Sequence, residues 1–426
     1  MRVLILGAGF AGSYVARYLG RGDGEIDVTL VDRRNYMLYT PLLPEAASGT
    51  VEPRHAVVPV RVMCPRANLI RGRLLALDLS RKTAQVEAIE GEHSNVEFDQ
   101  LVVALGAVPR TAPVPGLTQH AVGFKTIAEA IHLRNHVLEQ LELANVVEDP
   151  KRRERLLTFV FVGGGYAGVE ALAELEDLAT DASRYYPRLA RTPRRWVLVD
   201  IAPRILPELH GGLGPYATEQ LRRRGIELRL STSITSVTKE GVTLSTGETI
   251  ETATLVWTAG VRPSPLLSKL GLPLDERGRV RVDQYLRVEG IDAAWALGDG
   301  AAVPNAATPG QTDPPTCQHA LRQARALSRN LVATARGEPL RAYRYRMLGQ
   351  VATLGRHKGV AEVVGVPLRG WLGWWVTRTY HLYQLPLASR KLRVVADWTV
   401  GLFFRRDVAE LGTPAMPEGL EPPEDG

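Results

Sequence analysis

RVLILGAGFAG, from Arg2 to Gly12, is the stretch that decides how the N-terminal part of this chain folds. Residues 2–6 form a short apolar run that is typical of a buried parallel strand. Gly7, Gly9 and Gly12 then give the pattern G-x-G-x-x-G, and the residues that follow have helical spacing. In this pattern the first glycine makes the tight turn, the second lets the backbone approach a pyrophosphate, and the third lets the helix pack on the strand. The sequence therefore predicts a strand, a glycine turn and a helix whose N-terminus favours an anion.

A carboxylate stands at the distance that this pattern requires. The second apolar run, IDVTLVD, ends at Asp32, 20 residues after Gly12. A carboxylate at the end of that strand accepts hydrogen bonds from the ribose hydroxyls of a dinucleotide. A glycine turn without a ligand is the alternative. The strand before the turn, the helix after it and the acid at this distance together predict a dinucleotide site.

The same arrangement occurs a second time. LLTFVFVGGGYAGVEALAELEDL contains an apolar run, then Gly163, Gly165 and Gly168, and then an amphipathic helical pattern. The next apolar run ends at Asp200, and we expect a helix extended through residues 181–194 to account for the longer separation. One such unit indicates a dehydrogenase, whereas two in one chain indicate electron transfer between two dinucleotides, one of them a flavin.

The second acid also bears on the choice of nicotinamide cofactor. A carboxylate at Asp200, rather than a basic residue, favours NADH over NADPH. Arg204 is close in sequence, and an arginine near this position can accept the 2′-phosphate of NADPH. The sequence thus favours NADH and leaves NADPH open.

Three further stretches end apolar runs at small residues. Residues 101–110 (LVVALGAVPR) and 254–265 (TLVWTAGVRPSP) have the pattern expected where a chain crosses between domains beside a cofactor. Residues 293–302 (AAWALGDGAA) place Asp299 where we expect the following helix to start, as an acceptor for flavin hydroxyls. Each stretch alone is more often a plain glycine turn, and their order along the chain is what supports the cofactor interpretation.

Composition limits the class of protein. The 426 residues suggest two or three domains, and a hydrophobic content of 45% is enough for sizeable cores. No apolar run approaches the roughly 20 residues that span a bilayer, and the N-terminus lacks a secretory signal pattern. Cys64 and Cys317 cannot make a disulfide framework, which fits a reducing, cytoplasmic setting. The net charge of +6 favours an anionic partner, namely a nucleotide, a nucleic acid or a lipid surface.

The C-terminal fifth differs from the rest of the chain. Residues 341–406 contain 12 lysines and arginines against two acids, and residues 407–426 contain six acids and no base. Helical spacing predicts two stripes on helix faces. The first contains Trp371, Trp374, Trp375, Arg378 and Leu382, so a cation interrupts its apolar residues. The second contains Val395, Trp398 and Leu402, and basic residues flank it on both sides, namely Arg390, Lys391 and Arg393 before it and Arg405 and Arg406 after it. Aromatic residues with basic flanks suit the headgroup boundary of a membrane. A dimer interface and ordinary core are the alternatives.

The motifs, taken in order, resemble those of a known family. GAGFAG, VVALGA, GGGYAGVE, VWTAGVRP and WALGDGA are similar to the motifs of the flavoproteins with two dinucleotide-binding domains. PPTCQHALRQA, GQVATLGRHKGVAEV and the tryptophan-rich tail are more specific and resemble type II NADH dehydrogenases, the single-subunit, non-proton-pumping NADH:quinone oxidoreductases. The resemblance extends to about Asp407.

The resemblance implies cofactors and roles for individual residues. Non-covalent FAD is expected to contact Gly7, Gly9, Gly12, Asp32, Ala104, Gly106 and Asp299, and NADH to contact Gly163, Gly165, Gly168, Asp200 and Gly260. Glu170 is expected beside the nicotinamide and flavin rings, although a helix-start acid stabilised by the dipole is the alternative. Gln318 is expected to bind a carbonyl of a membrane quinone. The chain departs from the family pattern at Cys317, where alanine is usual, and at Arg322, where a second glutamine is usual and Gln323 stands next to it.

Other chemistries have less support. Residues 32–49 lack the C-x4-C motif of disulfide reductases, so electrons are expected to pass from the flavin to a diffusible acceptor. Cys64 is expected to be buried and inert, and Cys317 to be a small packing residue. His132 and His136 have no third ligand near them in sequence, so no metal site is predicted, and no nucleic-acid-binding module is present. A soluble reductase with a protein acceptor, a sulfide:quinone reductase-like enzyme and a non-catalytic NADH sensor remain as alternatives.

We therefore expect an α/β fold with two Rossmann-like domains and a C-terminal amphipathic membrane-surface segment. The expected FAD domain comprises residues 1–115 and 266–335, and the NADH domain comprises 116–265. Residues 336–406 are the expected membrane-association domain, which contacts anionic lipid through 370–406, and 407–426 are an acidic, flexible tail. The predicted protein oxidises NADH and reduces a quinone at the cytoplasmic face of the cell membrane, as a peripheral protein and with a homodimer left open.

Overall fold

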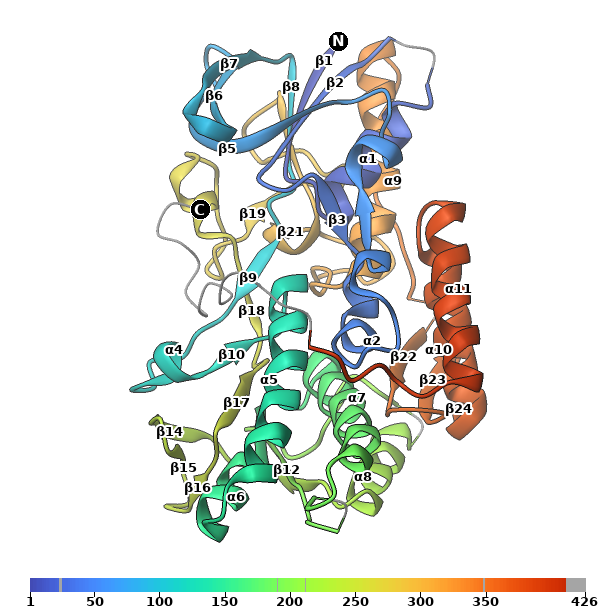
Figure 1. The fold of residues 1–426 in the computed structure, drawn as a ribbon. Helices are drawn as coiled ribbons and strands as arrows, with labels where there is room; N and C mark the ends of the chain where they lie inside the picture. Colours follow the sequence, from blue (N-terminus) through green and yellow to red (C-terminus); the bar gives the residue numbers. More distant parts are fainter. Residues whose placement is uncertain (23–24, 190, 211, 348, 411–426) are drawn as a thin grey trace.

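The computed structural model of the chain describes residues 1–426 except 23–24, 190, 211, 348 and 411–426. Two large sheets lie at opposite ends of the molecule, and the C-terminal helices lie along one side, at mid-height between them (Figure 1).

The upper sheet in Figure 1 has seven strands in the order β20-β8-β1-β2-β5-β6-β7. Their bounds are β20 (Ala294–Ala296), β8 (Gln100–Val103), β1 (Arg2–Leu6), β2 (Asp27–Asp32), β5 (Asn68–Asp78), β6 (Thr83–Ala88) and β7 (His93–Glu97). The strands from β20 to β5 are parallel. The apolar residues of β1 are buried, as is typical of a parallel sheet that is covered on both faces. The helices α1 (Phe10–Leu19) and α9 (Cys317–Arg336) pack against each other beside this sheet.

The lower sheet has five parallel strands in the order β10-β17-β11-β12-β13. Their bounds are β10 (Val122–Gly123), β17 (Thr254–Trp257), β11 (Thr158–Val162), β12 (Arg195–Val199) and β13 (Glu227–Arg229). The helices around it are α5 (Ile127–Val146), α6 (Pro150–Leu156), α7 (Tyr166–Ala182) and α8 (Leu213–Arg223). A capping box starts α5, in which the Thr126 hydroxyl accepts the N–H of Glu129 and the Glu129 carboxylate accepts the N–H of Thr126.

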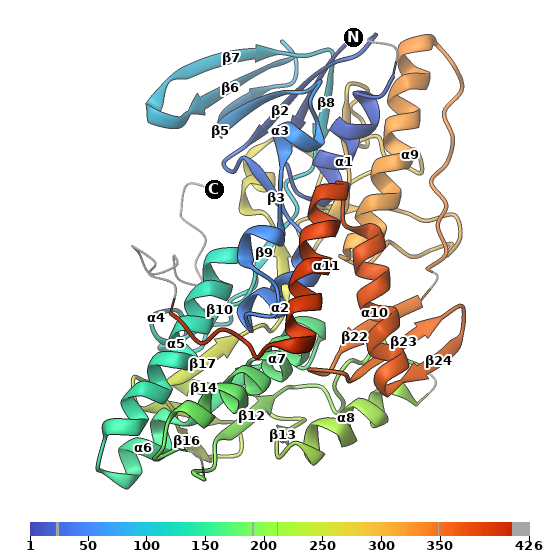
Figure 2. The same cartoon turned by 45° about the vertical axis from the view of Figure 1, so that its right-hand side comes forward.

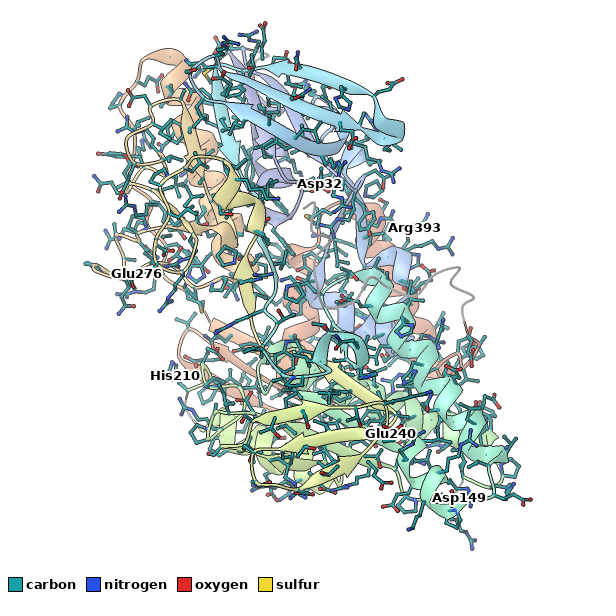
Figure 3. The ribbon with its side chains drawn as sticks, turned by 90° about the vertical axis from the view of Figure 1, so that its left-hand side faces the viewer. Asp32, Asp149, His210, Glu240, Glu276 and Arg393 are labelled. Atoms are coloured by element: carbon teal, nitrogen blue, oxygen red, sulfur yellow. The ribbon has the colours of Figure 1, made fainter. Side chains whose placement is uncertain are left out.

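The two segments in which the chain passes from one of these sheets to the other lie side by side. β9 (Ala107–Pro109) pairs antiparallel with β18 (Val261–Pro263). The N–H of Arg110 donates to the carbonyl oxygen of Gly260 at 3.1 Å, so both chain segments are fixed at one place. Asp32 lies toward the middle of the molecule, between the sheets, whereas Asp149 lies at the far end of the lower part (Figure 3).

The C-terminal part forms a small antiparallel sheet and two helices. The sheet contains β22 (Gly349–Thr353), β23 (Gly359–Val363) and β24 (Val366–Arg369), and the helices are α10 (Gly370–Gln384) and α11 (Ala388–Phe403). Figure 2 shows α11 in front of the short helix α2 (Leu43–Ala47), with the small sheet next to α8. Within the described part of the chain, no helix has both the length and the apolar character needed to cross a bilayer.

Two expectations about helix bounds are wrong. α7 ends at Ala182 and the 3₁₀ turn η4 (Ser183–Tyr185) follows, so the described residues between Tyr185 and β12 do not extend the helix. Pro187 and Pro193 lie in this stretch, and proline cannot continue a helix because it lacks an N–H. Asp299 lies in the 3₁₀ turn η6 (Gly298–Gly300), and α9 starts well after it, at Cys317.

The predicted tryptophan stripe does not form one exposed face. Trp371 and Trp375 are exposed and their rings stack, whereas Trp374 is buried. The guanidinium of Arg378 lies between the rings of Trp374 and Trp398, at 4.3 and 4.7 Å from the ring centroids. Arg406, predicted as a basic flank, is also buried. Most of the predicted acidic tail, residues 411–426, lies outside the described residues.

Candidate functional site

The N-terminal glycine turn leaves no room for side chains at two of its three glycines. Gly7 has a φ of +100°, and a Cβ there would lie 2.4 Å from the carbonyl oxygen of Ala104. A Cβ on Gly12 would lie 1.9 Å from the carbonyl oxygen of Gly7. A Cβ on Gly9 would meet nothing within 4 Å, so this residue faces open space. The turn therefore packs closely behind the helix and is open in front of it.

The second glycine turn repeats this geometry. Gly163 has a φ of +120°, and a Cβ there would lie 2.5 Å from the hydroxyl oxygen of Thr258. A Cβ on Gly168 would lie 1.9 Å from the carbonyl oxygen of Gly163. Gly165 again faces open space. The two turns thus share both the close approach and the open face.

The two carboxylates at the strand ends also make the same kind of local hydrogen bonds. The carboxylate of Asp32 accepts the N–H of Ala8 at 2.7 Å and the backbone N–H two residues after itself at 2.8 Å. The carboxylate of Asp200 accepts the N–H of Gly164 and the backbone N–H two residues after itself at 2.6 Å. Each carboxylate fixes its glycine turn and keeps further lone pairs for ribose hydroxyls.

The helix N-termini behind these turns fit a pyrophosphate. Neither α1 nor α7 has a side-chain cap, and neither carries an acid in its first turn. Their first N–H groups therefore have no side-chain acceptor and face the open space at Gly9 and Gly165. FAD at α1 and a nicotinamide dinucleotide at α7 fit this donor set.

The remaining predicted cofactor residues lie at the crossing and at η6. Gly106 and Gly260 have φ values of +65° and +93° and open space beside them, and Ala104 ends the buried run after β8. Asp299 lines a cavity of about 520 Å³, and burial raises the pKa of its carboxyl. No described residue donates a hydrogen bond to this carboxylate, so it fits as an acceptor for flavin hydroxyls.

Glu170 lies in the second turn of α7 and its carboxyl holds a proton near neutral pH. Burial raises its pKa to about 8, the N–H and hydroxyl of Thr353 oppose this rise, and the charges of Glu174 and Glu45 add to it. The N–H of Thr353 donates to Oε1 of Glu170 at 2.8 Å. An acid stabilised by the helix dipole would have a lowered pKa, so the raised pKa argues against that alternative.

Gln318 lies in the first turn of α9 and is held by the C-terminal part. Its Oε1 accepts the hydroxyl of Tyr345 at 3.2 Å, and its Nε2 donates to the carbonyl oxygen of Gly349 at 3.3 Å. The amide nitrogen has two N–H groups, so one remains for a ligand carbonyl. Thr316 caps the helix and fixes the turn that carries Gln318.

Strand β22 connects these two side chains. Its first residue, Gly349, accepts from Gln318, and its last residue, Thr353, donates to Glu170. An antiparallel strand rises about 3.4 Å per residue, so these backbone contacts lie about 13 Å apart. Between them, Gln350 accepts the hydroxyl of Tyr166 at 2.8 Å. Sequence reasoning gave these β22 residues no role, although the segment GQVATLGRHKGVAEV was part of the family resemblance.

The residues at which the chain departs from the family pattern, and Gln323 beside them, have defined surroundings in the structure. Gln323 is buried, accepts the N–H of Gly298 at 2.8 Å and donates to Asp313 at 2.9 Å, so it supports the turn that carries Asp299. The guanidinium of Arg322 lies 5.2 Å from the ring centroid of Tyr345. Burial raises the pKa of the Cys317 thiol to about 11. This thiol is a free thiol in the structure and lacks the thiolate character of a redox cysteine.

Comparison with known proteins agrees with this geometry. Residues 1–324 match the family described as pyridine nucleotide-disulphide oxidoreductase. The type II NADH:quinone oxidoreductase Ndh of Mycobacterium tuberculosis is 31% identical, over 95% of this chain and 89% of its own length. The demethylphylloquinone reductase NdbB of Synechocystis is 30% identical, over 93% of this chain and 95% of its own length.

The structural comparison supports the same fold. NDH2 of Plasmodium falciparum, solved in complex with NADH, superposes with a TM-score of 0.87 and 20% identity, covering 96% of this chain and 99% of that chain. This likeness shows the shared fold, and the sequence matches show the family. The chain therefore belongs to the pyridine nucleotide-disulphide oxidoreductases and, within them, to the type II NADH:quinone oxidoreductases.

Proposed function

We propose that this chain oxidises NADH and passes two electrons through FAD to a quinone, without proton pumping. The observation that carries the proposal is strand β22, whose two ends contact Gln318 and Glu170. β22 thereby sets the distance between the start of α9, which carries Gln318, and α7, which carries Glu170. The FAD cofactor, when bound, supplies the redox chemistry by accepting hydride and donating electrons.

The chain's own residues bind and orient the two dinucleotides. The glycine turn at 7–12, with Asp32, Ala104, Gly106 and Asp299, would hold FAD. The glycine turn at 163–168, with Asp200 and Gly260, would hold NADH. The guanidinium of Arg204 donates to the carbonyl oxygen of Pro207 at 2.8 Å and keeps further N–H groups, so the preference for NADH rests on the carboxylate of Asp200.

Glu170 and Gln318 would serve the two half-reactions. The carboxyl of Glu170 holds a proton near neutral pH and lies in a desolvated place, which suits a group that gives and takes protons. The free N–H of Gln318 would donate to a quinone carbonyl, which orients the acceptor.

The test of the quinone role is Gln318→Ala, with Gln311→Ala as the matched control in the exposed loop before α9. Reoxidation of the reduced enzyme by a short-chain quinone should slow by about tenfold or more, the kinetic effect of losing one hydrogen bond to the substrate. Reduction by NADH, followed by flavin bleaching in a stopped-flow instrument, should keep its wild-type rate. Equal rates for both half-reactions in Gln318→Ala would refute the assignment of the quinone site.

We also propose that the C-terminal helices dock the protein on the cytoplasmic face of the cell membrane. Thirteen of the twenty exposed large hydrophobic side chains among the described residues lie within residues 363–404. Arg393 and Arg405 are exposed in the same region, and Figure 3 shows Arg393 at its outer surface. Each cation near an anionic leaflet contributes about 1 kcal/mol, and the apolar side chains add to this. A quinone is dissolved in the membrane, so a reductase must meet it there.

Point substitutions test this docking better than deletion of the tail, because Trp374, Arg378 and Arg406 are buried in the protein. The double variant Phe403→Ser and Phe404→Ser removes two exposed aromatic side chains at the end of α11. Binding to vesicles that contain phosphatidylglycerol should weaken by about tenfold or more, since burying a phenylalanine contributes about 1.5–3 kcal/mol.

The control for the docking test is Val146→Ser, which removes an exposed apolar side chain at the end of α5. This variant should bind vesicles as the wild type does. Unchanged vesicle binding of the double variant would refute the docking surface, and loss of a dimer on size-exclusion chromatography would assign the surface to a homodimer.

A further inference from the structure

Helix α7 carries a row of acids that starts at the proposed proton-holding residue. Glu170, Glu174, Asp177 and Asp181 follow one another at spacings of four, three and four, so they share one side of the helix. The Glu174 side chain is 1% exposed, and the hydroxyl of Ser48 donates to its Oε2 at 2.9 Å. Burial is the main cause that raises the pKa of Glu174, and the charge of Arg406 opposes this rise. A buried row of like charges is unstable unless a cation reaches it.

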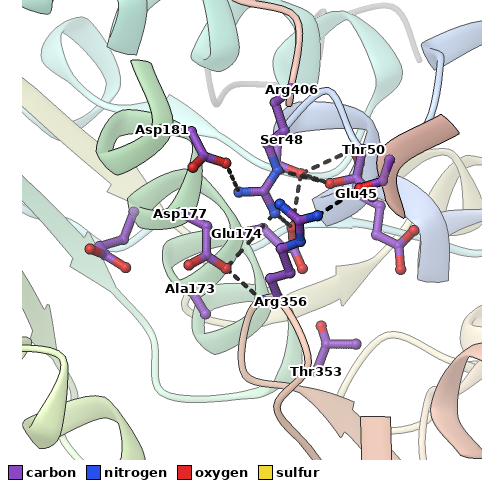
Figure 4. A network of polar contacts seen from close by, with 12 residues as sticks. Glu45, Ser48, Thr50, Ala173, Glu174, Asp177, Asp181, Thr353, Arg356 and Arg406 are labelled. Atoms are coloured by element: carbon purple, nitrogen blue, oxygen red, sulfur yellow. Dashed lines mark hydrogen bonds and ion pairs between the residues drawn. The ribbon is translucent and has the colours of Figure 1, made fainter. Parts of the chain in front are cut away.

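That cation comes from the far end of the chain. Arg406 follows α11, and its side chain is 7% exposed. Its Nη2 lies 2.9 Å from Oε2 of Glu174, and its guanidinium lies 3.8 Å from Asp177 and 3.7 Å from Asp181. Its Nε donates to the hydroxyl of Thr50 at 3.1 Å. Figure 4 shows the guanidinium inserted between α7 and the loop after α2.

Other charged groups face this row, and most have partners of their own. Arg224 pairs with Asp177 and with Glu176, and the N–H of Arg356 donates to Asp177 at 2.6 Å. Arg184 lies 3.9 Å from Asp181, and Tyr166 on α7 faces Glu170. Glu45, Arg378 and His357 face the row from the other elements packed there. Arg378 pairs with Glu45, and burial lowers the pKa of His357, so neither side chain replaces Arg406 at Glu174.

We propose that Arg406 is a positioning residue for Glu170, which it influences through Glu174 one helical turn away. Its guanidinium favours the ionised form of Glu174 and holds that carboxylate in place, and so sets the charge that faces Glu170. This inference rests on the proposed function of Glu170 in the reaction. Glu170 is followed by Glu174 at a spacing of four, which brings the two side chains together on the helix.

The direction of the effect follows from the charges. In Arg406→Gln, the two carboxyls of Glu170 and Glu174 share a buried site that has lost its directly bonded cation, so the pair binds a proton more tightly. In Glu174→Gln, the guanidinium stays without its carboxylate, so Glu170 gives up its proton more easily. The two substitutions therefore move the titration of Glu170 in opposite directions, which a general loss of packing does not do.

The experiment measures the titration of protonated carboxyls in the flavin-loaded full-length enzyme by their infrared absorbance. It also measures the pH profile of NADH oxidation with a water-soluble quinone in detergent. Arg406→Gln should raise the apparent pKa of both curves by about one unit or more, the effect of one charge at close range. Arg406→Lys should restore most of the wild-type position, and Glu174→Gln should shift both curves the other way.

The matched control is Arg222→Gln, which removes an exposed cation of α8 and leaves the α7 row untouched. Its curves should coincide with those of the wild type. Equal shifts in Arg222→Gln and Arg406→Gln, or shifts of the same sign in Arg406→Gln and Glu174→Gln, would overturn the proposal. Should Arg406→Gln not fold, the other two variants decide the question: Arg406→Lys should keep the wild-type position, and a Glu174→Gln curve that does not move to lower pH would overturn the proposal.

The infrared titration separates this inference from the proposed function. Glu170→Gln should remove the carboxyl band whose titration Arg406 controls. If that band shifts as expected but the enzyme reduces no quinone, the positioning by Arg406 holds and the proposed function fails. If the enzyme reduces quinone but the titration of the band does not shift in Arg406→Gln, the proposed function holds and the positioning by Arg406 fails.

Discussion

Arg378→Met tests how the C-terminal helices are held to the rest of the protein. Arg378 and Glu45 form an ion pair at 3.2 Å, with side chains 12% and 5% exposed. The indole N–H of Trp398 donates to the other carboxylate oxygen of Glu45 at 2.5 Å. The guanidinium is stacked between Trp374 and Trp398, so one side chain joins α10, α11 and α2. Methionine keeps much of the volume and removes the charge.

The expected cost comes mainly from the carboxylate that is left behind. Removing one partner of a buried pair costs about 3–5 kcal/mol, because the other charge stays buried without compensation. The lost stacking on two indoles adds about 0.5–2 kcal/mol for each ring. Glu45→Gln in the same chain removes the stranded charge, and a neutral amide can still accept the Trp398 N–H. The double variant should therefore recover a large part of the loss caused by Arg378→Met.

Hydrogen exchange of the α10 and α11 amides is the suitable assay, because it reports local opening in a protein of several parts. An opening free energy lowered by about 3–5 kcal/mol speeds exchange by roughly a hundred- to several-thousand-fold. Arg393→Met, at an exposed arginine of α11, is the matched control and should change exchange by less than about threefold. The reasoning fails if Arg378→Met exchanges no faster than this control, or if Glu45→Gln adds to the loss instead of reversing it.

Three other predictions concern the proposed site. Burial holds the pKa of Glu170 at about 8 against its ordinary 4.5, so its contribution to stability is present below 4.5 and is lost as the pH rises through 8. Glu170→Gln should thus lose less unfolding free energy in urea than the wild type between about pH 4.5 and about pH 8, and parallel curves would contradict this. Burial raises the pKa of Cys64 to about 12 and that of Cys317 to about 11, so a double serine variant should keep NADH:quinone activity within about twofold. Asp200→Ser should lower the kcat/KM ratio of NADH to NADPH by about tenfold, or about 1.4 kcal/mol, and an unchanged ratio would remove Asp200 from cofactor selection.

The glycine turns could be read from the sequence because their geometry is local. The close approach of Gly12 to Gly7 involves residues five positions apart, and a fixed pattern of glycines is needed wherever it occurs. The contact of Asp32 with Ala8 spans 24 positions and that of Asp200 with Gly164 spans 36, within one strand-helix-strand unit in each case. Spacing along the chain is enough to predict such contacts.

The contacts that join the distant parts of the chain could not be read in this way. Glu170 and Thr353 are 183 positions apart, Glu174 and Arg406 are 232, and Arg378 and Glu45 are 333. Helical periodicity predicts which residues share a face but not which part of that face turns inward. The prediction for the tryptophan stripe failed for this reason, since the buried carboxylate of Glu45 draws Arg378 and its two flanking indoles inward.

The C-terminal part therefore has two kinds of aromatic and basic residues with separate tasks. Trp374, Trp398 and Arg378 hold the helices to α2, whereas Trp371 and Trp375 remain on the surface that we propose for lipid. The same part supplies β22, which contacts Glu170 and Gln318, and Arg406, which reaches the acids of α7. One continuous segment, from Gly349 to Arg406, thus carries both the surface that we propose for lipid and the contacts to Gln318, Glu170 and Glu174.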